Sequence, residues 1–231
     1  MEAILVDYMG TDVTVVNAAR VSFNKESSYK LTEMGELLKE KDSKLLYYLA
    51  RHEHFTPFTH CTVTMRERVP LFVARQRFKH TIGFSYNEVS RRYVDEDPEF
   101  YKPEEWRGKA SDKKQGSSNE VIDINPLTPY GSRSMIDDYD TVLNRCTWVY
   151  KQLLRKGVCP EQARMVLPQS MYTEYYVTGS LYAWARAYNL RSKPDAQQEI
   201  QELASSWHDV IIKLFPESWL ALTHDKIAAG K

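Results

Sequence analysis

The residues with the most specific chemistry in this chain lie between positions 70 and 93. Cationic and amide side chains come first, a segment rich in hydroxyl and amide groups follows, and two further arginines close the stretch. Positive charge combined with several directed hydrogen-bond donors is what binds a phosphate ester. These residues therefore predict a phosphate site, and a nucleotide is the ligand that we expect first. A helix followed by a solvated loop would give the same composition without any ligand.

Two elements must position these side chains. Pro70 favours the first position of a helix because its φ angle is already helical, and Leu71, Ala74 and Phe78 recur after it at helical spacing. From Lys79 onward this spacing is lost, and the next residues are mainly those that favour turns and loops. The sequence therefore predicts a helix whose end carries cations and a polar loop that supplies hydroxyls.

The loop carries a more specific pattern. Its string Ser85-x-Asn87-Glu88-x-Ser90-x-Arg92-Tyr93 closely resembles the signature region of the flavin-dependent thymidylate synthases, the ThyX family. That family usually has Arg-His-Arg, then seven residues, then serine. Here Lys79-His80-Thr81 stands in place of the triplet, and eight residues separate it from Ser90. A register that begins at Arg75 and ends at Ser85 also fits the count, but it misplaces the rest of the pattern and we reject it.

Further blocks resemble the same family in the same order along the chain, at residues 18–23, 52–58, 161–168 and 189–200. The resemblance implies a set of residues that bind dUMP: Gln76, Lys79, Glu88, Ser90, Arg92, Arg164 and Arg191. It also implies a set that contacts FAD: His54, Thr56, Lys79, His80, Thr81, Asn87, Glu88, Ser180 and Arg186. Of the latter, Ser180 and Arg186 stand where the family often has asparagine or another polar residue. Arg191 is the candidate catalytic residue.

The reaction that the resemblance implies is the reductive methylation of dUMP to dTMP. Methylenetetrahydrofolate would provide the carbon, and FAD reduced by NADPH would provide the hydride, because the transferred carbon must end as a methyl group. Uracil reacts poorly by itself. An arginine that stabilises charge on its N3–C4 amide would activate it without a covalent bond to a cysteine. Peptide N–H groups near residues 88–90 are expected to help bind the phosphate.

The altered triplet predicts weaker flavin binding. Lys79 keeps one charge but lacks the planar two-point geometry of a guanidinium, and Thr81 keeps only a hydroxyl. Arg77 or Arg91 could supply the missing cation, with the extra loop residue bringing one of them within reach. We therefore expect FAD to be lost in part on purification.

Two other kinds of function would use some of the same residues. A metal-dependent nucleotide phosphohydrolase would use His52, His54 and His60, although such sites usually need a further carboxylate or thiolate, and we expect no metal. A nucleic-acid-binding module would use basic and aromatic side chains: Arg75, Arg77, Lys79, Arg91 and Arg92, with Phe78 or Tyr86 for stacking. Neither alternative explains the distant blocks that contain Arg164 and Arg191.

Length and charge restrict the other possibilities. A chain of 231 residues suits one domain, residues 1–231. Basic and acidic residues number 31 each, so net charge favours neither nucleic acid nor an anionic membrane as a partner. The sequence shows no apolar run that could span a bilayer and no leader, so we expect a cytoplasmic protein. Its 3 widely spaced cysteines are expected to be reduced thiols.

The expected fold class is α+β, a small central sheet flanked by helices as in the family that the chain resembles. Strands are predicted at 3–6, which we expect to be buried, at 61–66 and at 171–178; helices are predicted at 11–19, after Thr32, after Ser43, at 135–156, after Pro160, at 179–191 and at 197–214. For residues 11–19, propensity alone leaves strand and helix open, and the resemblance favours helix.

Two further expectations concern the second half of the chain and its assembly. Residues 94–134 are expected to form an irregular insertion, and the apolar stripe of the 135–156 helix is expected to be core. The resemblance implies a homotetramer whose active sites are shared between subunits. The 15 tyrosines and 5 tryptophans would supply aromatic surface for such an assembly.

Overall fold

The computed structural model describes residues 1–33, 35–93, 96–110, 116–125 and 134–228. The strands are β1 (Glu2–Met9), β2 (Lys30–Thr32), β3 (Gly35–Leu37), β4 (Thr62–Pro70), β5 (Phe84–Glu88), β6 (Arg107–Lys109), β7 (Ser117–Val121) and β8 (Tyr172–Ser180). The helices are α1 (Asp12–Arg20), α2 (Glu40–Arg51), α3 (Leu71–Arg77), α4 (Met135–Arg155), α5 (Pro160–Ala163), α6 (Leu181–Arg191), α7 (Gln198–Leu214) and α8 (Pro216–Ala228). Short 3-10 turns lie at η1 (Val21–Phe23), η2 (Thr56–His60) and η3 (Arg164–Val166).

A four-stranded antiparallel sheet in the order β1-β4-β8-β5 forms the centre of the fold. Strand β4 pairs with β8 along its whole length, from Thr62 opposite Ser180 to Pro70 opposite Tyr172. The edge strand β5 pairs with the second half of β8, and Glu88 lies opposite Tyr175. The predicted combination of helices with a small sheet is confirmed, as are the strands at 61–66 and 171–178.

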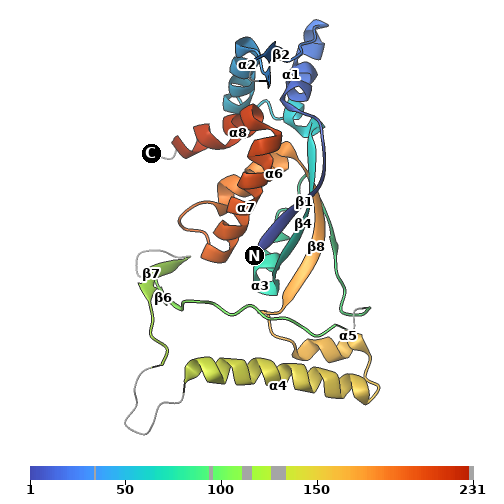
Figure 1. Cartoon of the computed structure of the whole chain (residues 1–231), viewed down its shortest axis with the longest axis vertical. Coiled ribbons are helices and arrows are strands. Elements are labelled where there is room, and N and C mark those ends of the chain that lie inside the picture. The colour runs from blue at the N-terminus through green and yellow to red at the C-terminus, as the bar shows by residue number, and fades with distance from the viewer. Residues whose placement is uncertain (34, 94–95, 111–115, 126–133, 229–231) are drawn as a thin grey trace.

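One face of this sheet packs against α6 and α7, and α8 packs on these two helices and on α2 (Figure 1). Side chains alternate between the two faces of a strand, so Val63, Met65 and Val69 of β4 all point into this core. Three tryptophans from the helices fill the layer between: Trp184, Trp207 and Trp219. The opposite face of the sheet carries half-exposed side chains such as Ile4 and Tyr176. The prediction of flanking helices is therefore right for one face.

Most of the predicted helices are present, and the exceptions have local causes. The helices at 11–19, after Pro160, at 179–191 and at 197–214 are confirmed. The helix predicted after Thr32 is wrong, because β2 and β3 form a hairpin there and Gly35 adopts a φ of 115°. The helix predicted after Ser43 is present as α2 but begins at Glu40, and the Ser43 hydroxyl donates to Glu217 of α8.

Strand β1 is present, but its predicted burial is wrong. Ile4 and Val6 are 48% and 44% exposed, because β1 is an edge strand with the uncovered face of the sheet on one side. The segment after Lys79 also differs from the predicted loop. Phe84 and Tyr86 alternate with Ser85 and Asn87, and this period of two is a strand pattern that the polarity of the stretch obscured.

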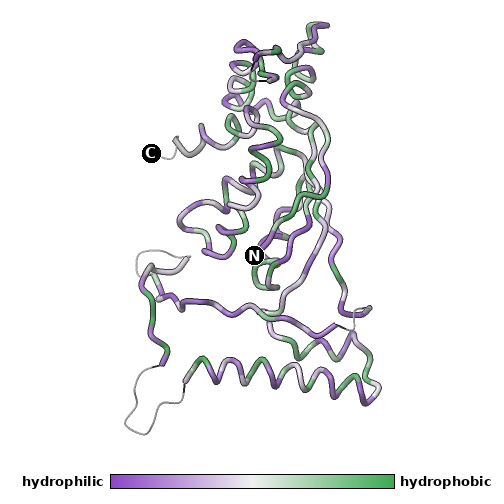
Figure 2. Tube along the Cα trace, viewed as in Figure 1, coloured by the Kyte–Doolittle hydropathy of each residue, from purple (hydrophilic) through white to green (hydrophobic). Residues whose placement is uncertain are grey.

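The long helix predicted at 135–156 is present as α4. It ends before Gly157, whose φ of 84° is not helical. Its apolar stripe is not the core of this chain. Within α4 only Leu143 and Tyr150 are buried, whereas Val142 and Trp148 are 55% and 51% exposed. Figure 1 shows α4 beyond the end of the sheet, beside α5 alone among the helices, and Figure 2 shows hydrophobic and hydrophilic residues alternating along it. The stripe is therefore only partly buried and lies outside the main core, and other apolar side chains of α4 such as Trp148 are exposed beside it.

The described part of the predicted insertion is more regular than expected, because β6 and β7 form a small antiparallel hairpin. The remainder of 94–134 lies partly outside the described residues. Within the part of the chain that the structure covers, we find no helix with the length and hydropathy that crossing a membrane requires.

Candidate active site

Each end of strand β5 opens on a cavity. At its amino end, a cavity of about 240 Å³ is lined by Lys79, His80, Thr81, Arg186 and Arg191 with neighbouring apolar side chains, and we call it the His80 pocket. At its carboxyl end, a cavity of about 870 Å³ is lined by residues that include Glu88, Ser90, Arg92 and Arg164, and we call it the Ser90 pocket. A strand rises about 3.3 Å per residue, so the ends of β5 lie roughly 13 Å apart.

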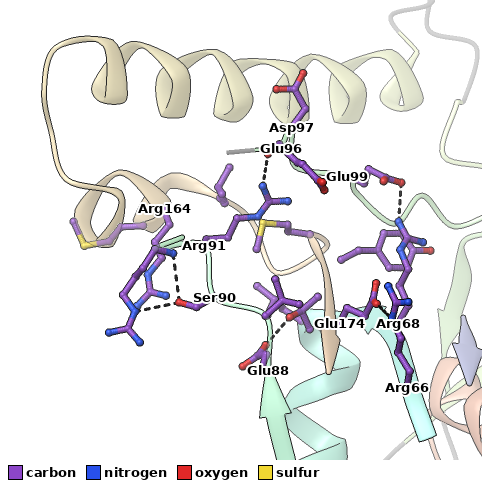
Figure 3. A pocket seen from close by; sticks show the side chains of 18 residues that line it. Arg66, Arg68, Glu88, Ser90, Arg91, Glu96, Asp97, Glu99, Arg164 and Glu174 are labelled. Carbon is purple, nitrogen blue, oxygen red and sulfur yellow. Dashed lines mark hydrogen bonds and ion pairs between the residues drawn. The ribbon is translucent and has the colours of Figure 1, made fainter. Parts of the chain in front are cut away.

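The Ser90 pocket brings together four residues of the predicted dUMP set. The Ser90 hydroxyl accepts a hydrogen bond from Arg92 Nε at 3.1 Å, and Arg92 also lies 3.7 Å from the carboxylate of Glu161. Arg164 is exposed and lies close to Ser90 in Figure 3. Its side chain has no hydrogen bond or ion pair with the described residues. Glu88 accepts a hydrogen bond from the Thr173 hydroxyl at 2.6 Å. One hydroxyl and two guanidinium groups thus converge where an anion could bind.

The far side of the Ser90 pocket holds cations that the sequence did not single out (Figure 3). Arg66 pairs with Glu174, and Arg68 donates to Glu99 at 2.7 Å while lying over the Tyr172 ring. Because carboxylates already neutralise these arginines, the Ser90 side of the pocket is the better place for a phosphate.

One expected phosphate contact is wrong. The N–H group of Val89, in the middle of the 88–90 segment, donates to the carbonyl of Glu174 at 2.8 Å. It extends the pairing of β5 with β8 by one residue and cannot bind a ligand at the same time. This N–H group is therefore not available to the phosphate, and the contacts expected from the N–H groups of Glu88 and Ser90 stay a prediction.

In the His80 pocket, Arg191 is held by two acceptors. Its Nε donates to Nε2 of His80 at 2.9 Å, and its Nη2 donates to the carbonyl of Gln76 at 3.4 Å. The position follows from local structure, because α6 ends at Arg191 and α3 ends just after Gln76. The Gln76 side chain in turn donates to Gln197. Two members of the predicted dUMP set, Gln76 and Arg191, therefore meet here and not in the Ser90 pocket.

The electrostatics of this pocket keep His80 neutral. Burial, and then the positive charges of Arg191, Arg77 and Arg186, lower the pKa of His80 to about 4. Burial and the charge of Arg77 likewise lower the pKa of Arg191, which as a guanidinium still stays charged at neutral pH. The pair at neutral pH is therefore a cationic donor and a neutral imidazole acceptor.

Below this pocket lies a buried charged network. Arg77 is fully buried, and its Nε donates to the Glu67 carboxylate, which is also fully buried, at 3.2 Å. The Tyr175 hydroxyl donates to Glu67, and Arg77 Nη1 donates to the Tyr86 hydroxyl, each at 2.5 Å. Tyr86 completes the chain by donating to the carbonyl of His80 at 2.8 Å.

Sequence reasoning did not identify this network, although signals for both charges were present. The alternation Val63, Met65, Glu67, Val69 places Glu67 on the buried face of β4. On α3, Arg77 follows Val73 and Ala74 at helical spacing and so shares their buried side.

The burial of Arg77 also corrects the idea that it supplies the cation missing from the triplet. Its guanidinium lies between the rings of Phe84, Trp184 and Trp207, out of reach of a ligand. Arg91 lines the Ser90 pocket at the other end of β5 and donates to the carbonyl of Glu96. Arg186 is better placed than either. It is exposed and lines the same cavity as Thr81. Its side chain forms no hydrogen bond or ion pair within the described part of the chain.

The other predicted flavin contacts lie around α6 with two exceptions. The Ser180 hydroxyl caps α6 by accepting from the N–H of Ala183 at 3.2 Å. His54 and Thr56 are exposed on either side of Phe55, whose ring stacks on Tyr182 of α6 at 5.1 Å. Glu88, in contrast, lies in the Ser90 pocket, and Asn87 lies beside it on β5, opposite Tyr176, and lines neither cavity.

The geometry supports neither alternative function. The rings of His52 and His54 lie 6.3 Å apart against Tyr48, and no three His, Cys, Asp or Glu side chains of the described residues are grouped as metal ligands. For nucleic acid, Arg77 is buried and Tyr86 is committed to its hydrogen bonds. The phosphohydrolase therefore lacks its ligand set in this part of the chain, and the binding module lacks its continuous basic surface.

Comparison with known proteins agrees with this geometry. The family described as "Thymidylate synthase complementing protein" matches residues 4–217 of the chain. A flavin-dependent thymidylate synthase from Thermosipho africanus is 40% identical over 200 residues, which cover 87% of this chain and 81% of the relative. One from Thermus thermophilus is 36% identical over 217 residues, covering 94% of this chain and 73% of the relative.

Solved structures extend the likeness to three dimensions. The UMP/dUMP methylase PolB from Streptomyces cacaoi, bound with 5-Br dUMP, is similar with a TM-score of 0.76 at 28% identity, over 95% of this chain and 93% of that one. The same methylase bound with 5-Br UMP gives a TM-score of 0.75 at 26% identity, over 96% and 93% of the two chains.

Proposed function

The chain belongs to the flavin-dependent thymidylate synthase family, and from this premise we propose that it converts dUMP to dTMP by reductive methylation. In the balanced reaction, methylenetetrahydrofolate gives the carbon, NADPH and one proton give the reducing equivalents, and tetrahydrofolate and NADP⁺ are released with dTMP. The observation that carries the proposal is the pair of pockets at the two ends of β5, one suited to a phosphate and the other to a uracil amide.

The phosphate of dUMP would bind in the Ser90 pocket. Arg164 is an exposed guanidinium without a competing carboxylate among the described residues, and Arg92 and Ser90 are already aligned beside it. A phosphate that takes over Arg92 has only the loose contact with Glu161 to displace, since that pair is exposed and 3.7 Å apart. Charge-assisted contacts to a phosphate are stronger than such a pair.

The uracil ring would bind against Arg191. C5 of the ring reacts as a nucleophile when the ring carries enolate-like negative charge, and this charge is delocalised onto O4 of the N3–C4 amide. A guanidinium held in place before the reaction stabilises that charge without reorganisation. Arg191 fits this role because two of its donors are fixed by His80 and Gln76 while the others remain free.

The residues of the His80 pocket fit a flavin. Lys79 and Arg186 are exposed cations suited to its phosphates, and Ile82 and Leu190, which are 72% and 52% exposed, offer apolar surface to a flat ring. Lys79, Thr81 and Arg186 would hold the cofactor. Bound FAD supplies the hydride that brings the transferred carbon to the methyl level.

We further propose a homotetramer with shared active sites. One dUMP needs both pockets, yet within one chain β5 separates them by roughly 13 Å. A second subunit that brings its His80 pocket to the Ser90 pocket of the first would complete the site. The exposed apolar side chains of α4 offer surface for assembly: Met135, Ile136, Val142 and Trp148. Light scattering should give the mass of a tetramer, and a monodisperse monomer would contradict this arrangement.

The proposed mechanism uses no cysteine nucleophile. Cys61 is buried, and burial followed by the charge of Asp12 raises the pKa of its thiol to about 12. Cys146 and Cys159 line neither of the two pockets as the structure describes them. Cys159 is exposed at the start of α5, and Cys159→Ala should keep most of the turnover.

A direct assay tests the function. The purified protein with FAD, NADPH, methylenetetrahydrofolate and dUMP should form dTMP, measured by chromatography, and should show flavin absorption bands. Omission of NADPH, methylenetetrahydrofolate or dUMP should abolish the product, and omission of added FAD should lower it to the level that the retained flavin supports. A protein that binds flavin but forms no dTMP under anaerobic conditions would contradict the proposed function.

A further inference from the structure

We propose that His80 is the positioning residue for Arg191: its Nε2 atom orients the guanidinium, and the buried Arg77 and Tyr86 fix the His80 backbone for this task. The inference rests on the proposed function and assigns a role to a side chain that the sequence placed in contact with the flavin.

The first step is the geometry of Arg191. A guanidinium is planar, so two hydrogen bonds from different nitrogens fix both the position and the plane of the group. His80 Nε2 and the Gln76 carbonyl accept these two bonds. The Nη1 atom and the second hydrogen of Nη2 then point in directions set by the protein rather than by the ligand.

The second step is the choice of a neutral acceptor. A carboxylate at this position would also orient Arg191, but it would cancel the charge that the uracil amide needs. The low pKa of His80 keeps the imidazole neutral, with its proton on Nδ1 and its lone pair on Nε2. His80 thus orients Arg191 and leaves its full charge available.

The third step is the support of His80 itself. The Tyr86 hydroxyl donates to the His80 carbonyl at 2.8 Å and accepts from Arg77 Nη1 at 2.5 Å. Glu67 fixes Arg77 from the other side, and both charged side chains are fully buried. Burial raises the pKa of Tyr86 to about 12, so its hydroxyl stays a donor at neutral pH. The buried ion pair thus anchors the Tyr86 hydroxyl, which in turn fixes the backbone below the imidazole.

This arrangement predicts different kcat values for two amide substitutions of His80. In His80→Gln the amide oxygen can reach the place of Nε2 and accept from Arg191, whereas in His80→Asn it reaches only the place of Nδ1. We expect His80→Gln to retain kcat for dTMP formation within about fivefold and His80→Asn to lose about 100-fold, the scale of an active-site displacement of about 1 Å.

Flavin affinity separates positioning from cofactor binding. Because His80 Nε2 already accepts from Arg191, neither amide variant should weaken FAD, and both dissociation constants should stay within about threefold of the parent by fluorescence titration. Tyr86→Phe, which removes the support but keeps His80, should lower kcat by about tenfold with FAD binding unchanged. It also provides a second measurement if His80→Asn folds poorly.

A matched histidine provides the control. His208 accepts a hydrogen bond from Trp219 Nε1 at 2.9 Å and lines neither pocket. His208→Gln should leave kcat and FAD affinity as in the parent, although its melting temperature can change. Equal kcat values for His80→Gln and His80→Asn, or loss of FAD in both, would overturn the inference while the parent still forms dTMP. A parent that forms no dTMP would overturn the proposed function, and this inference with it.

Discussion

At the carboxyl end of β5, Arg92 and its carboxylate partner Glu161 are both exposed, whereas the cations at the amino end lie above an ion pair that is fully buried. In the Ser90 pocket, the side chains of Arg92 and Glu161 are 45% and 63% exposed and lie 3.7 Å apart. Below the His80 pocket, Arg77 and Glu67 are both fully buried and 3.2 Å apart. Exposed pairs contribute little and exchange partners readily, whereas breaking a buried pair is strongly unfavourable.

The difference corresponds to what each end has to do. A phosphate brings its own charge and can reorganise flexible arginines when it binds. A group that stabilises charge in a transition state must already be in place. The first end can therefore consist of long exposed side chains, while the second needs a buried support.

The largest predicted effect is the loss of stability when the charge of the buried carboxylate is removed. Glu67→Gln leaves Arg77 without its counter-ion, and the free energy of unfolding should fall by about 3–5 kcal/mol. Glu174→Gln, which breaks the partly exposed pair with Arg66, should cost less than about 1 kcal/mol. Urea unfolding at fixed protein concentration measures both. Similar losses in the two variants would remove the contrast between the two ends.

The next largest effect concerns Arg191. Arg191→Ala removes the preorganised cation and should lower kcat/KM for dUMP by about 10²- to 10³-fold, with the fold intact by circular dichroism. Arg75→Ala is the matched control, because Arg75 is exposed on α3 and lines neither pocket. A loss of less than about threefold in Arg191→Ala would show that another group activates the uracil.

In the Ser90 pocket, substitutions should change the affinity for dUMP rather than kcat. Arg164→Ala should weaken dUMP by about 1.5–3 kcal/mol, roughly 10- to 100-fold in the dissociation constant, and Arg92→Ala should act similarly. The value of kcat at saturating dUMP should change little, because the phosphate contact is the same in the ground and transition states. Calorimetric titration with dUMP provides the test. Unchanged affinity in both variants would place the phosphate elsewhere.

A smaller effect is expected for the flavin. Arg186→Ala should raise the FAD dissociation constant by about tenfold, since an exposed cation is screened by water. Thr81→Arg in the Arg186→Ala background should restore part of the affinity, because both positions line the His80 pocket. Arg91 lines the other pocket, so the Arg91→Ala variant should bind FAD like the parent. The assignment of Arg186 fails if its loss leaves FAD affinity unchanged.

The smallest effect is a pH dependence of stability. The pKa of His80 is about 4 in the folded chain, against an ordinary value of 6.5. Between these values the unfolded chain binds a proton that the folded chain excludes, so stability is highest above pH 6.5 and declines as the pH falls toward about 4. His80→Gln removes this group, and its loss of stability between pH 7 and pH 5 should be smaller than that of the parent. Parallel urea midpoints for both proteins would contradict the buried neutral imidazole.

The sequence was informative where one pattern dominated. The spacing of apolar residues predicted α4 and α7, and the family blocks brought the residues of both pockets together in one list. Periodicity reports that a helix has an apolar side but not what covers it. The apolar stripe of α4 was therefore assigned to the core, although the structure leaves Val142 of the stripe exposed and buries only Leu143 and Tyr150 of α4.

The division of the site could not be predicted because it depends on β5. A flexible loop would allow Lys79 and Ser90 to approach one ligand together, and the polar composition of the segment favoured a loop. Pairing with β8 makes the segment extended and separates the two groups. The Glu67–Arg77 pair was missed for a different reason, since each charge lies on a buried face of its own element and only the tertiary structure brings the two faces together.

The pairing of β4 with β8 has a consequence for how the chain folds. Pro70 lies opposite Tyr172, so the pair closes a loop of roughly 100 residues, and both pockets depend on it because β5 and α6 are attached to β8. Contacts so distant in sequence form late and slowly, and the active site can be completed only after β8 has been synthesised. Loop-closure entropy, however, grows slowly with length, and doubling this loop would cost only about 0.6 kcal/mol. Added length between the two strands, outside α3 and β5, therefore costs little loop-closure entropy.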